Sequence, residues 1–263
     1  MRSLPPVRVG GLGRMGIHQQ RFSVSSMSPT LWLDAADPLS IIEESGRVSQ
    51  WRDKSGNGNH ALQESTSQQP LTGTHTINNK NAIFFDGISN NFTLDPIKLS
   101  GSDELTILFA ARLETVPDSI SRAYFGFGGN SVYRAYCNAG NDDLSLAYKH
   151  HSVDLMKYSG LTTDSLNTPQ ILGVIGRKAK AAGVICGDIG LLFNENAASD
   201  NAIGFTDAAV GAINTSGYGA INASIGEFLV FKRALSNFEL NNVGTYLSKK
   251  WGAQFHQIGS AEL

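Results

Sequence analysis

Short apolar runs separated by polar turns follow one another along most of the chain, a pattern typical of an all-β protein. The run Leu105–Leu113 is almost continuously apolar and predicts a central strand. Gln170–Arg177 predicts another buried strand, and Ile225–Phe231 is the last clear one. Shorter strands are predicted at Leu31–Leu33, Arg47–Trp51, His60–Leu62, Ala82–Phe85, Asn91–Leu94, Tyr124–Gly128, Ser131–Cys137, Leu144–Tyr148 and, in two runs, Val184–Phe193, with a polar loop at Gln63–Thr76.

One segment near the C-terminus has a helical period instead. Its apolar residues recur at spacings of three and four, at Leu235, Phe238, Leu240, Val243, Tyr246, Leu247 and Trp251. Ser236 and Glu239 have the spacing of a capping box, and Gly252 follows as a residue that ends a helix. The sequence therefore predicts a two-sheet antiparallel jelly-roll sandwich with a terminal helix over residues 236–251.

The first 28 residues differ from the rest of the chain. They are rich in glycine and proline, and their apolar residues show no regular period, so we place the globular domain at residues 29–263. Such a segment is either a disordered tail or an arm that becomes ordered where a neighbouring subunit holds it. We favour an extended assembly arm that contacts its partners through Arg2, Arg8, Arg14 and Arg21.

Charge and composition argue against several classes of protein. The 263 residues carry a formal net charge of −2, so no basic surface indicates nucleic-acid binding. Residues 1–28 contain no apolar segment typical of a signal peptide, and no run of about 18 apolar residues predicts insertion into a membrane. Cys137 and Cys186 lack metal-ligand spacing, and we interpret them as two buried thiols rather than a disulfide.

The motifs that would indicate catalysis are absent from the sequence. Glu-x-Asp-x-Glu, which would place glycosidase carboxylates on one face of a strand, does not occur. Glu43-Glu44 and Asp142-Asp143 lie in sequence typical of loops. Neither Gly-x-Ser-x-Gly nor His-Glu-x-x-His occurs, and the G-x-G-x-x-G pattern at Gly11–Gly16 lacks the strand and helix that dinucleotide binding requires. The sequence thus predicts a protein that is not an enzyme, without catalytic or cofactor-binding residues.

Glu227 is a carboxylate in the middle of an apolar strand. Simple alternation along Ile225–Phe231 puts Ile225, Glu227 and Leu229 on one face and Phe228 on the other. We expect Glu227 to pair with Arg233 or to accept backbone hydrogen bonds. The alternative is a buried catalytic carboxylate.

The segment Trp51–Ala61 (W-R-D-K-S-G-N-G-N-H-A) alternates glycine and asparagine and predicts a compact polar turn. It follows L-W-L-D-A at Leu31–Ala35 and precedes A-I-F-F-D-G at Ala82–Gly87. The strand I-G-E-F-L-V-F and the helix that ends in K-W-G complete the set. In order and spacing these pieces resemble the concanavalin A-like lectin/glucanase superfamily in its laminin-G-like form, over nearly all of residues 29–253.

The resemblance implies possible ligands as well as a fold. Laminin-G-like domains often hold Ca²⁺ at a rim through loop oxygens, and the candidates here are Asp53, Asn57, Asn59 and Asp86. We favour the other interpretation, in which these side chains bond to the backbone of their own turns. Candidate aromatic residues for sugar stacking are Tyr133, Tyr136, Tyr148, Tyr158 and Tyr218.

Domains of this kind resemble those on the tails, fibres and capsid decorations of tailed bacteriophages. Together with the basic arm, this leads us to predict a non-enzymatic virion structural protein made in the host cytoplasm. The arm would anchor the chain to other virion subunits, as part of a homo-oligomer, and the lectin-like domain would bind host-surface glycans. The alternatives are a carbohydrate-binding adhesin module and, last, a glycan hydrolase.

Overall fold

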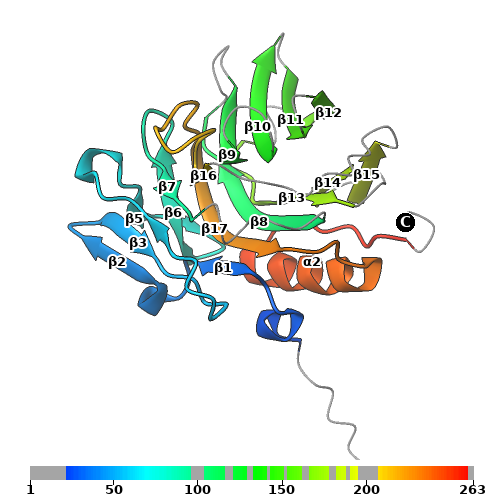
Figure 1. The fold of residues 1–263 in the computed structure, drawn as a ribbon, viewed down its shortest axis with the longest axis horizontal. Coiled ribbons are helices and arrows are strands. Elements are labelled where there is room, and N and C mark those ends of the chain that lie inside the picture. Colours follow the sequence, from blue (N-terminus) through cyan, green and yellow to red (C-terminus); the bar gives the residue numbers. More distant parts are fainter. Residues whose placement is uncertain are drawn as a thin grey trace, which may run out of the picture.

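The part of the chain that the structure describes forms an antiparallel β structure with one α-helix (Figure 1). The computed structural model describes residues 22–95, 104–115, 121–128, 133–140, 143–150, 153–161, 166–177, 182–187, 190–194 and 207–259. The arginines predicted to contact partners, Arg2, Arg8, Arg14 and Arg21, lie outside these residues.

The strands are short, as their apolar runs predict. The first seven are β1 (Leu31–Asp34), β2 (Ile41–Glu44), β3 (Arg47–Trp51), β4 (Ala61–Leu62), β5 (Leu71–Ile77), β6 (Lys80–Asp86) and β7 (Phe92–Thr93). The next five are β8 (Leu105–Leu113), β9 (Arg122–Phe127), β10 (Tyr133–Gly140), β11 (Asp143–His150) and β12 (Val153–Leu161). The last five are β13 (Gln170–Gly176), β14 (Ala182–Cys186), β15 (Gly190–Asn194), β16 (Ala208–Val210) and β17 (Asn222–Phe231).

Strand β17 is the centre of one layer. Along one edge, the first part of β17 pairs with β6 and the second part pairs with β1. The other edge of β17 pairs with β8, and β13, β14 and β15 follow as successive neighbours in the same layer. The facing layer runs from β4 through β7, β16, β9 and β10 to β11 and β12. The predicted all-β sandwich is confirmed, and the jelly-roll order of its strands stays a prediction.

Aromatic rings fill the space between the two layers. Phe109, Phe125 and Phe228 are fully buried, with ring centroids 5.6–6.0 Å apart. Edge-to-face and tilted contacts of this kind add to the stabilisation that comes from burying the rings. Phe85 joins the same core, whereas Phe84 is half-buried and stacks on His75 with ring centroids 3.9 Å apart.

The two faces of β17 pack against different parts of the protein. Phe228 and Val230 point into the sandwich, while Leu229 and Phe231 pack beneath the α-helix. The register against β8 shifts between Ile225 and Glu227, so Ile225 belongs to the sandwich core. Our assignment of Ile225 to the face of Glu227 was therefore wrong, because a β-bulge interrupts the alternation.

The helix α2 (Asn237–Trp251) has the predicted boundaries and caps. Ser236 and Glu239 form a reciprocal capping box, and Gly252 ends the helix with a φ of 71°. The helix covers the outer side of the layer that contains β17 and β8 (Figure 1). Among the helices of the described residues, none is long and apolar enough to cross a membrane.

Three short 3₁₀ helices complete the structure: η1 (Val24–Met27), η2 (Pro38–Ser40) and η3 (Thr66–Gln68). Val24 is buried beside α2, so the described end of the predicted arm packs on the domain. The predicted loop over Gln63–Thr76 contains η3 and most of β5. Most side chains of β5 are polar and at least partly exposed, so its sequence lacks the alternation of apolar and polar residues that predicts a strand. Glu43 and Glu44 lie on β2, rather than in a loop.

Candidate functional site

The glycine- and asparagine-rich turn is fixed to the strand that precedes it. Asp53 accepts hydrogen bonds from the backbone N–H of Trp32 (2.9 Å), Ser55 (2.8 Å) and Asn59 (2.9 Å). The side-chain amides of Asn57 and Asn59 donate to the carbonyl of Thr30. Both Asp53 oxygens are therefore used to shape the turn.

Asp86 has a similar role at a different place. Its Oδ1 atom accepts from the backbone N–H groups of Ile88, Ser89 and Asn90 at 2.8–3.0 Å. Asp86 pairs with Asn222, at the first residue of β17. The turn that contains Asp53 is bonded to Trp32, which pairs with Leu229 near the other end of β17. As arranged, the four candidate calcium ligands do not form one site, and the described residues contain no cluster of acidic, histidine or cysteine side chains suited to a metal ion.

Glu227 is fully buried beneath α2 and binds four donors. Its carboxylate accepts from Trp32 Nε1 (2.6 Å), Trp251 Nε1 (2.8 Å) and Tyr246 OH (2.9 Å), and it forms an ion pair with Lys250 (2.8 Å). The predicted pairing with Arg233 was wrong, because Arg233 binds Glu239 at the start of the helix instead. The sequence could not show that Trp32, 195 residues earlier, would be a partner.

Ion pairs extend from Glu227 towards the surface. Lys250 also binds Asp34 (2.7 Å), and Lys54 joins Asp34 (2.8 Å) to Asp37 (2.7 Å). Burial raises the pKa of Glu227, while the charge of Lys250 opposes this. Burial and the Glu227 carboxylate raise the pKa of Tyr246 above its usual range, so Tyr246 stays a hydrogen-bond donor. Because Glu227 is enclosed, its role is to join α2 to β1 and β17.

Tyr218 is the aromatic candidate that the structure presents to solvent. Its side chain is 55 % exposed on the loop that follows β16. The other candidates, Tyr133, Tyr136, Tyr148 and Tyr158, lie on β10, β11 and β12, and their side chains are outside the described part.

The side-chain amides of Asn214 and Asn91 hold the Tyr218 loop in place. Asn214 Oδ1 accepts from the backbone N–H of Ser216 and Tyr218, at 3.2 and 3.1 Å. The side chain of Asn91, which is fully buried, donates to the carbonyls of Asn214 (3.3 Å) and Thr215 (3.1 Å). The ring of Tyr218 is therefore carried by a loop that is anchored to the β-sandwich.

Ile88 lies on the neighbouring turn, which Asp86 closes, and is 79 % exposed. The two turns touch, since a Cβ atom on Gly217 would lie 3.0 Å from the Ser89 carbonyl oxygen. We call Ile88, Ser89, Ser216 and Tyr218 the rim surface. Sequence reasoning missed Ile88 and the support from Asn91, although Asn214–Gly219 (N-T-S-G-Y-G) resembles the earlier Gly-Asn turn in composition.

No protein-family model and no curated protein matches this chain in sequence. Solved structures do share its fold. The binding domain of Paraclostridial Mosquitocidal Protein 1 matches 87% of this chain at 13% identity, with a TM-score of 0.60. Trypanosoma rangeli sialidase, solved with sialic acid, matches 85% at 11% identity, with a TM-score of 0.59. A GH54 α-L-arabinofuranosidase matches 78% at 14% identity, with a TM-score of 0.57.

This chain covers 56%, 33% and 51% of those three proteins, respectively. At such low identity the likeness establishes a common fold and no more. The lectin-like, all-β fold expected from the resemblance to known families is compatible with these neighbours.

The prediction that this chain is not an enzyme is overturned, because sialidases and an arabinofuranosidase are among the structures that share its fold. The prediction relied on the absence of a carboxylate pair within one strand. Two carboxylates can also be brought together from separate strands and loops, which a linear motif does not detect. The missing motif therefore gives no ground for excluding glycan hydrolysis.

Proposed function

We propose that this domain binds glycans and that the rim surface makes the contact. The observation that carries the proposal is Tyr218, a half-exposed aromatic ring on a loop that the amides of Asn91 and Asn214 hold in place. Tyrosine offers a large amphipathic face at a low cost in conformational entropy, and anchoring the loop reduces that cost further. The β-sandwich that this chain shares with glycan-processing proteins supports the proposal.

The chemistry of the rim surface suits the hydroxyl-rich, uncharged face of a sugar. Ile88 and Tyr218 supply apolar area, while Ser89 and Ser216 contribute hydroxyl groups beside it. The nearby Asp86 uses its Oδ1 atom to accept three backbone hydrogen bonds of its own turn. Sugar sites of this type combine an aromatic platform with a few polar groups that fix orientation.

Replacing Tyr218 with alanine should weaken binding to any glycan that the intact protein retains on a glycan array by about tenfold or more, as loss of a central aromatic contact does. Tyr218→Phe should keep most of the affinity, since the ring remains. The matched control is Phe238→Ala, which removes a 75 % exposed aromatic ring from α2.

Thermal unfolding should be nearly the same for all three variants, because both side chains are exposed. Equal glycan binding by Tyr218→Ala and the intact chain would contradict the rim surface as the contact. An equal loss of glycan affinity in Phe238→Ala would show that the effect is not specific to the rim surface.

The virion role stays a proposal that rests on the resemblance and on the basic arm. If residues 1–21 anchor the chain to its partners, the full chain should sediment as an oligomer and a variant lacking these residues as a monomer. The truncation keeps Val24, which packs beneath α2, so the domain itself should remain folded. Substituting glutamine for Arg2, Arg8, Arg14 and Arg21 should give the same result as the truncation. Monomeric sedimentation of the intact chain would contradict self-assembly through the arm.

A further inference from the structure

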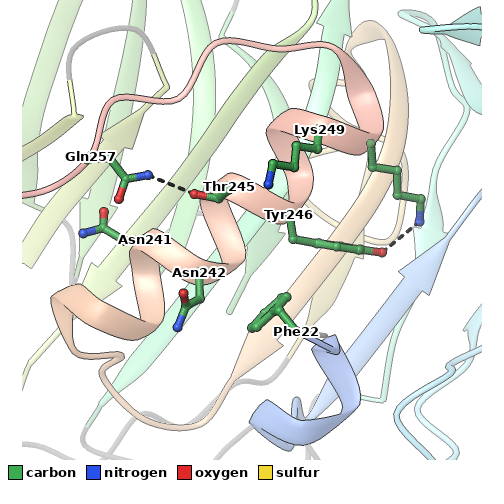
Figure 2. A pocket seen from close by; sticks show the side chains of 8 residues that line it. Phe22, Asn241, Asn242, Thr245, Tyr246, Lys249 and Gln257 are labelled. Carbon is green, nitrogen blue, oxygen red and sulfur yellow. Dashed lines mark hydrogen bonds between the residues drawn. The ribbon is translucent and has the colours of Figure 1, made fainter. Parts of the chain in front are cut away.

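A separate pocket of about 560 Å³ lies over the outer face of α2 (Figure 2). No residue of the rim surface lines it. Phe22, which lies two residues before η1, and Gln257, in the segment after α2, contribute to its walls. Its volume is within the range of sites that bind small molecules. It is lined by Phe22, Asn241, Asn242, Thr245, Tyr246, Lys249, Lys250 and Gln257.

The wall formed by the C-terminal segment is held tightly to the helix. Asn241 exchanges two hydrogen bonds with the backbone of Ile258, at 2.7 and 3.0 Å, and Gln257 Nε2 donates to Thr245 Oγ1 at 2.9 Å. Gly244 leaves room for the ring of Phe255, since a Cβ atom there would lie 2.1 Å from that ring. The pocket is therefore preformed.

The opposite wall is aromatic. The Phe22 ring packs on Tyr246 at a centroid distance of 5.9 Å, and Figure 2 shows these two side chains on the same side of the helix. The hydroxyl of Tyr246 is bonded to buried Glu227, which fixes the position of its ring. This wall can pack against the C–H face of a ring-shaped ligand.

The polar groups of the pocket favour a negatively charged ligand. Within the described part of the chain, exposed Lys249 forms no ion pair or hydrogen bond. Lys250, in contrast, is already neutralised by Asp34 and Glu227. None of the lining residues is acidic, and the amide of Asn242 and the carbonyl of Gln257 remain available for hydroxyl groups. One ammonium group, two amides and an aromatic wall thus meet in one place.

We propose that this pocket binds a sugar ring that carries a carboxylate, a ligand of the hexuronate class. The carboxylate pairs with Lys249, the ring hydroxyls bond to Asn242 and Gln257, and the apolar ring face lies against Phe22 and Tyr246. The inference is independent of glycan binding at the rim, because no residue is shared between the two surfaces.

Isothermal titration of the full chain with trigalacturonate tests the proposal. Its fully methyl-esterified form supplies the same rings without charge, and acetate supplies the charge without a ring. We expect trigalacturonate to bind and each of the other two to bind at least about tenfold more weakly, as expected for loss of a hydrogen bond to a charged group or of an aromatic contact.

Lys249→Gln should weaken trigalacturonate binding about tenfold, with an unchanged melting temperature. Arg47→Gln, which removes one positive charge from β3, should bind like the intact chain, and so should Tyr218→Ala at the rim. No binding of trigalacturonate, equal binding of the methyl ester, or full affinity in Lys249→Gln would each overturn the proposal. None of these outcomes would affect the test of the rim surface.

Discussion

Replacing Glu227 with leucine is expected to destabilise the domain by about 3–5 kcal/mol, the usual cost of removing one partner from a buried ion pair. The ammonium group of Lys250 would lose its fully buried partner. The indole N–H groups of Trp32 and Trp251 and the hydroxyl of Tyr246 would lose their acceptor at the same time. Buried donors without acceptors carry the full penalty of desolvation.

Urea unfolding at neutral pH, followed by tryptophan fluorescence, measures this effect. The double variant Glu227→Leu with Lys250→Met is the informative control, because it removes both charges and leaves an apolar pair of similar volume. It should recover a large part of the lost stability, as apolar replacements of buried ion pairs often do. A loss below about 1 kcal/mol in the single variant, which is the level of a surface pair, would contradict the central role of Glu227.

Gly126→Ala is expected to impair both stability and glycan binding. A Cβ atom at Gly126 in β9 would lie 1.9 Å from the carbonyl oxygen of Ile213 and 2.9 Å from its Cα atom. These are backbone atoms at the base of the Tyr218 loop, and Ile213 N–H itself donates to the Tyr218 carbonyl. The loop must move away from β9, at a cost of about 1–3 kcal/mol or more.

The matched control is Gly173→Ala in β13, where the added Cβ would lie 2.4 Å from the carbonyl oxygen of Ile107. Both variants should unfold at lower urea concentration than the intact chain. Measured on folded protein at low temperature, glycan affinity should fall only in Gly126→Ala. If the two variants retain equal affinity, the position of the loop does not govern binding.

Local sequence patterns predicted much of the fold, because single strands and helix ends are determined by residues close to one another in the sequence. Leu105–Leu113 is a nearly continuous apolar run and became the central strand β8. The Ser236–Glu239 spacing and Gly252 located both ends of α2. The bulge before Glu227 was not predictable in this way, since it depends on the register between β17 and β8.

The candidate sites were harder to predict because their parts come from distant segments. Tyr218 was one of five tyrosine candidates, and its loop is held by Asn91, which bonds to Asn214, 123 residues later. The pocket over α2 joins Phe22 to Gln257 across the length of the domain. Hydrophobic periodicity describes one segment at a time and carries no signal for such contacts.

The junction at Glu227 also determines the order in which the protein can mature on the ribosome. Strand β1 pairs with β17, and Trp32 bonds to a carboxylate 195 residues later. Until that distant stretch has emerged, β1 has an unpaired edge and α2 does not yet exist. Contacts between such remote segments slow folding, because a long loop must close before any of them is gained. The nascent chain must therefore remain incompletely folded until β17 and α2 have been synthesised, and this is the stage at which it depends most on chaperones.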